Sequence, residues 1–133
     1  GSGEKRTLRI AARYADGWNV PFVAPETFAS KRAVLHTHCA AVGRDPATVT
    51  RTVSGEIFLR ETEAEVGTES RSFWGEPFET WAPGNLVGTP EQVCEKLQAY
   101  VDAGCRGFVP WCADYPDTET MELLATKVMP EFR

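Results

Sequence analysis

The clearest structural signal in the chain is the segment VTRTVSGEIFLR, residues 49–60. Apolar residues at positions 49, 53, 57 and 59 share one phase of a two-residue period, and polar residues at 50, 52, 54, 56 and 60 share the other with Phe58. A period of two over this length predicts a β-strand. Gly55 within it predicts a bulge or the close approach of another backbone segment.

Helical patterns lie on both sides of this strand. Four helices are expected, at residues 4–15, 25–42 and 89–103 and from Asp117 onward. The third has the strongest signal, because Thr89 is a good N-cap, Pro90 suits the first helical position and Gln92 completes a capping box. Two short apolar segments, residues 18–23 and 106–111, have the composition of strands that are covered on both faces.

The expected elements alternate between helix and strand along the chain. Such an order predicts an α/β fold with a parallel sheet. Residues 61–83 interrupt it with an irregular loop that contains short helical pieces. About three strands are too few for a closed barrel, which needs about eight. We therefore expect a single domain, residues 1–133, that forms a piece of a larger (β/α) architecture.

Composition and charge exclude several classes of protein. The chain has 133 residues, a net charge of −5 and no cluster of basic residues, so no nucleic-acid partner is expected. No apolar run approaches the roughly 18 residues needed to cross a membrane, and no signal peptide is expected at the N-terminus. The four cysteines form no CxxC pair, which indicates free thiols and a cytoplasmic protein.

A metal site is not expected. His36 and His38 are two residues apart, so on a helix their side chains point about 200° apart and cannot share one ion. His36 and Cys39 share a face, but no third ligand follows at metal spacing.

Three segments resemble the luciferase-like monooxygenases, specifically the branch that uses the deazaflavin coenzyme F-420. They are GSGEKRTLR (1–9) leading into ARYADGWN (12–19), LVGTPEQV (86–93), and AYVDAG (99–104) leading to Gly107-Phe108. The resemblance implies a (β/α)8 TIM barrel, of which this chain supplies the C-terminal half, with about three parallel strands and four helices. It also implies an oxidoreductase or monooxygenase, a flavoprotein-like enzyme that uses coenzyme F-420 or FMN on a small-molecule substrate. Since about half of the barrel mouth is missing, the isolated chain is expected to be inactive or weakly active.

The resemblance places the cofactor's phosphate end beside Gly1, Ser2 and Gly3. Bare amides at a helix N-terminus favour a phosphate group. The same three residues are also typical of the remnant that an expression vector leaves behind. Trp18 and Asn19 are expected at the mouth as cofactor-binding residues, the alternatives being a core tryptophan and a turn asparagine.

Trp111 and Asp114 follow the last expected strand, where the resemblance also places the mouth. Trp111 is a candidate to pack against the cofactor ring, and Asp114 is a candidate substrate-binding residue. The alternatives are that Trp111 packs in the core and that Asp114 is an acidic residue preceding the next helix. Cys112 lies between them with no neighbouring cation in the sequence. The catalytic residues themselves are left unassigned.

The loop at residues 61–83 carries six glutamates and four aromatic residues, among them Trp74. The glutamates suggest a solvated surface, whereas exposed aromatic residues often mark a contact surface. Trp74 is therefore a candidate substrate-binding residue, or a contact for a partner chain. The alternative to an enzyme is a non-catalytic half-barrel that binds cofactor or forms oligomers. Open sheet edges favour pairing with another chain, and two copies can complete a barrel-like homo-oligomer.

Overall fold

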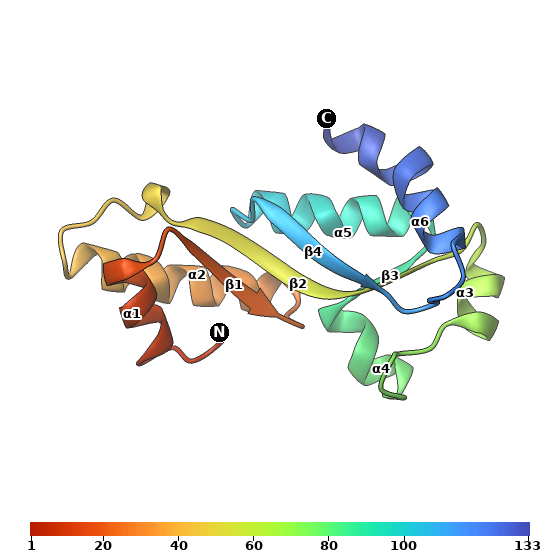
Figure 1. Cartoon of the computed structure of the whole chain (residues 1–133), viewed down its shortest axis with the longest axis horizontal. Coiled ribbons are helices and arrows are strands. Elements are labelled where there is room, and N and C mark those ends of the chain that lie inside the picture. Colours follow the sequence, from red (N-terminus) through yellow and green to blue (C-terminus); the bar gives the residue numbers. More distant parts are fainter.

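The computed structural model describes residues 1–133 and has four strands and six α-helices, with at least one helix between successive strands (Figure 1). The strands are β1 (Gly17–Pro21), β2 (Thr50–Leu59), β3 (Leu86–Gly88) and β4 (Gly107–Cys112). The helices are α1 (Thr7–Tyr14), α2 (Pro25–Ala40), α3 (Glu63–Glu69), α4 (Phe78–Trp81), α5 (Pro90–Asp102) and α6 (Glu119–Leu123). Short 3-10 turns occupy Pro46–Thr48 and Ala82–Gly84, and a π-helical turn (Leu124–Val128) and a 3-10 turn (Met129–Phe132) extend α6.

The expected order of elements is confirmed, with three corrections. The first helix begins at Thr7 and not at residue 4, so residues 1–3 do not directly precede it. The sheet has a fourth, three-residue strand, β3, which is too short to show a periodic pattern of its own. The last helix begins at Glu119, with Thr118 at the N-cap position, and not directly after Asp117. Asp117 still contributes to the start of that helix, because its carboxylate accepts a hydrogen bond from the first-turn amide Glu119 N at 3.1 Å.

Local sequence explains where the best-predicted helices begin. At α5, Thr89 Oγ1 accepts from Gln92 N at 3.4 Å and the Gln92 side chain accepts from Thr89 N at 3.0 Å. This reciprocal pair is the expected capping box. Pro25 is the first residue of α2. Its missing N–H does not disrupt the helix, because the N–H groups of the first turn have no acceptor within the helix. No helix in the structure combines the length and the apolar character needed to cross a membrane.

β2 is the central strand, and all of its neighbours run parallel to it. β1 pairs with the first half of one edge, and β3 pairs with the second half of the same edge. β4 pairs along the opposite edge, with Thr52 opposite Gly107 and Ile57 opposite Cys112. Ser54 and Ile57 each have partners on both sides, so β4 lies across β2 from both β1 and β3.

The two faces of the sheet have different surroundings. Side chains such as Trp18, Val20 and Val53 belong to one hydrophobic core that includes residues of α1, α2 and α5, the helices that lie alongside the strands in Figure 1. The register places Asn19, Thr52 and Ser54 on the opposite face, with Val109 and Trp111 of β4. In a complete (β/α) barrel the face without helices is the interior. Such an interior is packed with side chains, and ligands of these barrels bind at the carboxyl ends of the strands.

Candidate functional site

Four aromatic side chains meet at the carboxyl ends of the strands. Phe22 follows β1, Trp111 lies near the end of β4, and Phe73 and Trp74 come from the segment between α3 and α4. Ring centroids are 5.4 Å apart for Phe22 and Trp111, 5.8 Å for Phe22 and Trp74, 6.2 Å for Trp74 and Trp111, and 5.3 Å for Phe73 and Trp74. We call these four residues the aromatic cluster. Each is between 41% and 69% exposed, so the cluster offers ring surface to a ligand or a partner.

Phe22 reaches the cluster through an unusual backbone conformation. Its φ angle is +53°, and it is the one residue other than glycine with a positive φ. For a bulky side chain this conformation costs about 1–2 kcal/mol. It is held by the hydrogen bond from Phe22 N to Ser54 O at 2.9 Å and by the close approach of Gly84, where a Cβ would lie 2.6 Å from Phe22 O. Only glycine fits at position 84 in this arrangement.

A buried carboxylate anchors the segment that carries Trp74. Glu56 points from the middle of β2 to the face opposite the helices and is 1% exposed. Its Oε2 accepts hydrogen bonds from Phe73 N at 2.8 Å and from Trp81 Nε1 at 2.9 Å, whereas Oε1 has no partner. Glu56 therefore fixes both ends of the segment from Phe73 to Trp81. The sequence places Glu56 in the polar phase of an alternating strand, so its burial is not visible from the pattern alone.

Asn85 fills a gap between β1 and β3 along one edge of β2. Its Oδ1 accepts from Glu56 N at 2.6 Å, and its Nδ2 donates to Trp81 O at 2.6 Å. Lys96 supports the same turn from α5, because its Nζ donates to Ala82 O at 2.7 Å and to Asn85 O at 2.6 Å. Burial lowers the pKa of Lys96 to about 8, and nearby Glu26 opposes this effect. The turn before β3 is thus held from both sides.

A cavity of about 410 Å³ opens between the aromatic cluster and this turn. We call it the mouth pocket. Its lining residues are Phe22, Trp74, Glu76, Thr80, Trp81, Gly84 and Asn85. The predicted residue Trp74 lies in its wall, and the predicted residue Trp111 contacts that wall through Phe22 and Trp74. The structure therefore brings these two predicted residues together.

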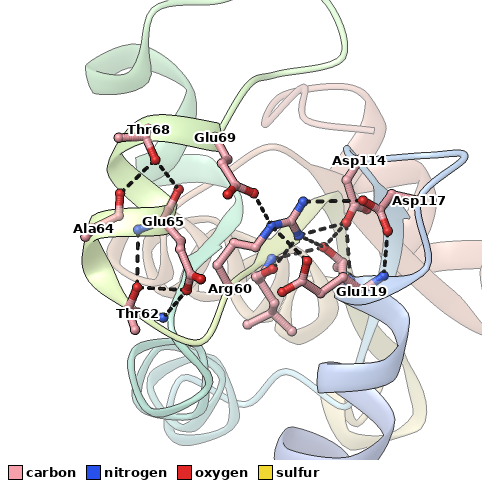
Figure 2. A network of polar contacts seen from close by, with 11 residues as sticks. Arg60, Thr62, Ala64, Glu65, Thr68, Glu69, Asp114, Asp117 and Glu119 are labelled. Atoms are coloured by element: carbon pink, nitrogen blue, oxygen red, sulfur yellow. Dashed lines mark hydrogen bonds and ion pairs between the residues drawn. The ribbon is translucent and has the colours of Figure 1, made fainter.

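Asp114 has a different setting from the one expected at the mouth. It is 1% exposed, and its Oδ2 accepts from Arg60 at 3.0 Å and from the Thr120 hydroxyl at 2.6 Å. In Figure 2 Arg60 lies between Glu69 on one side and Asp114, Asp117 and Glu119 on the other. The expectation that Asp114 contacts a substrate is therefore not supported, because Arg60 at the end of β2 takes up its charge.

Arg60 is the one cation within this cluster of carboxylates. Burial lowers its pKa, but hydrogen bonds to Glu69 and Asp114 outweigh that effect and raise the pKa overall. The guanidinium also lies over the Phe58 ring, 4.3 Å from its centroid. The cluster joins α3, the end of β2 and the start of α6, so its role in this structure is to hold these elements together.

Trp18 lies in the core, and its predicted place at the mouth is wrong. β1 runs from Gly17 to Pro21, so Trp18 is near its start, and the ring is 3% exposed and stacked on Phe28 at 5.7 Å. Asn19, the next residue, faces the other side, where its Nδ2 donates to Thr52 Oγ1 at 3.0 Å and its Oδ1 accepts from Ser54 Oγ at 2.9 Å. The two adjacent candidates are thus on opposite faces of the sheet.

The segment Gly1-Ser2-Gly3 lies against β1. The amino group of Gly1 donates to Asn19 O at 2.6 Å, and Trp18 Nε1 donates to Gly1 O at 2.9 Å. Lys31 Nζ, on α2, donates to Ser2 O at 3.0 Å. Lys31 Nζ also pairs with Glu4 Oε1 at 3.2 Å, so the three residues lie close to Asn19 and beside this ion pair.

The histidines and cysteines form no recognisable centre. His38 Nε2 is 2.9 Å from Glu4 O, and His36 Nε2 is buried without a partner. Burial lowers the pKa of His36, with the charges of Arg32 and Arg51 adding to the effect. No group of three His, Cys, Asp or Glu side chains is arranged to hold a metal ion. All four cysteines are free, and burial followed by the charge of Asp114 raises the pKa of Cys112.

Comparison with known proteins places this fold in a family. The family model described as luciferase-like monooxygenase matches residues 1–85, which is more than half of the chain. The chain therefore belongs to the luciferase-like monooxygenase family. A comparison with curated proteins gives no match.

Solved structures of enzymes share the fold at low identity. The coenzyme F-420-dependent tetrahydromethanopterin reductase of Methanopyrus kandleri is 16% identical with a TM-score of 0.75, over 100% of this chain and 50% of that chain. The EDTA monooxygenase of Chelativorans sp. BNC1 is 16% identical with a TM-score of 0.69, over 97% of this chain and 44% of that chain. The oxygenating constituent of 3,6-diketocamphane monooxygenase from Pseudomonas putida, solved with FMN, is 19% identical with a TM-score of 0.69, over 95% and 45%. The chain thus spans about half the length of these structures.

Proposed function

We propose that this chain forms the C-terminal half of the barrel of a deazaflavin- or flavin-dependent oxidoreductase, with coenzyme F-420 or FMN as its cofactor. The observation that carries the proposal is the aromatic cluster at the carboxyl ends of parallel strands in a chain of this family. Active sites of (β/α)8 barrels lie at that end of the strands. The cofactor, when bound, supplies the centre that transfers a hydride or activates oxygen on a small organic substrate.

The residues of this chain fit such a cofactor in two places. Trp111 is 48% exposed and Trp74 is 61% exposed, so both have free ring surface against which a flat heterocycle can pack. Gly1, Ser2 and Gly3 are the proposed contacts of the phosphate end, since their only side chain is one hydroxymethyl group and Lys31, paired with Glu4, lies beside them. We also keep Asn19 as a proposed cofactor contact, and we assign no such contact to Trp18.

In this proposal the residues of this chain bind and orient the cofactor and the substrate. The aromatic cluster excludes water from one side of the reacting centre, and Glu56 holds Trp74 in place through the segment that it anchors. Trp74 and the rest of the mouth pocket then contact the substrate. The residues that take part in the chemistry remain unassigned in this half.

A second candidate is a half-barrel that associates with another copy of itself. β1 and β4 each pair with a neighbouring strand on one side only, and open edges favour pairing with another chain. Two copies can complete a barrel-like dimer, with or without cofactor. The free state of all four cysteines favours a cytoplasmic location for either candidate.

Size-exclusion chromatography with light scattering, run without cofactor and with coenzyme F-420 or FMN, tests the proposal and separates it from the second candidate. A species that carries cofactor at the elution position of either a monomer or a dimer supports the cofactor-binding proposal. A dimer that carries no cofactor under any condition supports the non-catalytic module. The control is Tyr14→Ala, which removes an exposed ring on α1 and should leave every profile unchanged.

A further inference from the structure

The mouth pocket has three aromatic walls. Phe22, Trp74 and Trp81 contribute the rings. The indole N–H of Trp81 is taken by Glu56 Oε2 at 2.9 Å, so Trp81 offers its ring and no donor to the cavity. The Phe22 ring is held by its contacts with Trp74 and Trp111. These walls favour a flat apolar group.

The remaining lining residues give the pocket a negative character. Glu76 carries a carboxylate, whereas Thr80 and Asn85 are neutral, and no lysine or arginine lines the cavity. Lys96, which is partly buried, already donates to Ala82 O and to Asn85 O. The faces of aromatic rings are themselves electronegative. A cation is therefore favoured in this cavity, and an anion is disfavoured.

We propose that the mouth pocket binds an aromatic ring that carries a protonated amine. The ring packs against Phe22 and Trp74, and the ammonium group pairs with Glu76 and the aromatic faces. A volume of about 410 Å³ is at the lower end of the usual range for small-molecule sites, which suits a ligand of one or two rings. Calling this ligand the substrate rests on the proposed function, but the binding itself does not.

The test uses three ligands with the same ring and different charge: 2-phenylethylamine, 2-phenylethanol and 3-phenylpropionate. Binding is followed by tryptophan fluorescence without any cofactor, excited where phenyl groups do not absorb. We expect 2-phenylethylamine to bind about tenfold more tightly than 3-phenylpropionate, with 2-phenylethanol between them. Equal affinities, tighter binding of the anion, or no binding of the amine would overturn the proposal.

Two glutamate variants locate the charge preference. Glu76→Gln keeps the shape of the pocket and removes its carboxylate, so the preference for the amine should fall severalfold. Glu79→Gln is the matched control, because Glu79 is exposed on the neighbouring helix α4 and does not line the cavity. An equal effect of both variants would contradict the assignment to Glu76.

The outcome separates this inference from the proposed function. If the amine binds but neither coenzyme F-420 nor FMN does, the pocket assignment stands and the oxidoreductase proposal fails. If a cofactor binds but the amine does not, only the pocket assignment fails. Trp74→Ala should weaken all three ligands together, since it removes a wall and no charge.

Discussion

Replacing Gly84 by alanine is expected to strain the contact that holds Phe22 at the mouth. The new Cβ would lie 2.6 Å from Phe22 O and 2.8 Å from Phe22 C, which is closer than real Cβ contacts allow. Both atoms belong to the backbone, and the adjacent Phe22 N is tied to Ser54 O, so no flexible side chain can move away. Overpacking of this kind costs about 1–3 kcal/mol.

The loss is measured as a change in thermal midpoint. For a chain of this size, about 4 °C per kcal/mol applies, so Gly84→Ala should lower the midpoint by about 4–12 °C. Gly67→Ala is the matched control, because a Cβ there meets nothing within 4 Å and Gly67 lies inside helix α3. That substitution should raise stability by up to about 1 kcal/mol through helix propensity. If Gly84→Ala proves no worse than Gly67→Ala, the reasoning about Phe22 is refuted.

Two further predictions concern buried polar groups. Arg60→Leu leaves the carboxylate of Asp114 buried without its cation, so the free energy of unfolding measured in urea should fall by about 3–5 kcal/mol. Lys127→Leu breaks an exposed ion pair and should lower the free energy of unfolding by less than about 1 kcal/mol. Burial raises the pKa of the Tyr100 phenol in the folded state. Above about pH 10 the unfolded state loses this proton while the folded state keeps it. The free energy of unfolding should therefore fall as the pH rises beyond that value. Tyr100→Phe should remove this alkaline loss while Tyr14→Phe leaves it, and an unchanged slope in Tyr100→Phe would count against the buried phenol.

Much of the fold follows from local patterns in the sequence. The two-residue period at 49–60 matches β2, and the capping box at Thr89 marks the start of α5 because both signals depend on neighbours along the chain. β3 was missed because a three-residue strand owes its existence to pairing with the end of β2, not to its own composition.

The site was only partly predictable, because its residues depend on which face of the sheet each side chain takes. Trp18 and Asn19 are adjacent in sequence, yet one is in the core and the other on the opposite face. Asp114 lies next to the end of β4 as expected, but its charge is taken up by Arg60, 54 residues earlier in the chain. Trp74 was selected as an aromatic residue in an irregular loop, and Trp111 because the family resemblance places the end of the last strand at the mouth, so neither selection required the register.

The carboxylate of Glu56 connects the regular strand β2 with the irregular segment that lines the mouth pocket. It belongs to the polar phase of β2, but its role comes from contacts with Phe73 and Trp81 in a segment that has no periodic pattern. The same segment carries Trp74 and lines the mouth pocket. One strand residue therefore organises the part of the chain that is least predictable from sequence.

The most direct test of the proposed function is an equilibrium titration of coenzyme F-420 and of FMN with the wild-type chain and with Trp111→Ala, followed by cofactor fluorescence. If the aromatic cluster holds the cofactor ring, the wild-type chain binds at least one of the two, and Trp111→Ala weakens that binding about tenfold. Tyr14→Ala, which removes an exposed ring on α1, should bind like the wild type. Binding that is undiminished in Trp111→Ala, or absent for both cofactors, would contradict the proposal.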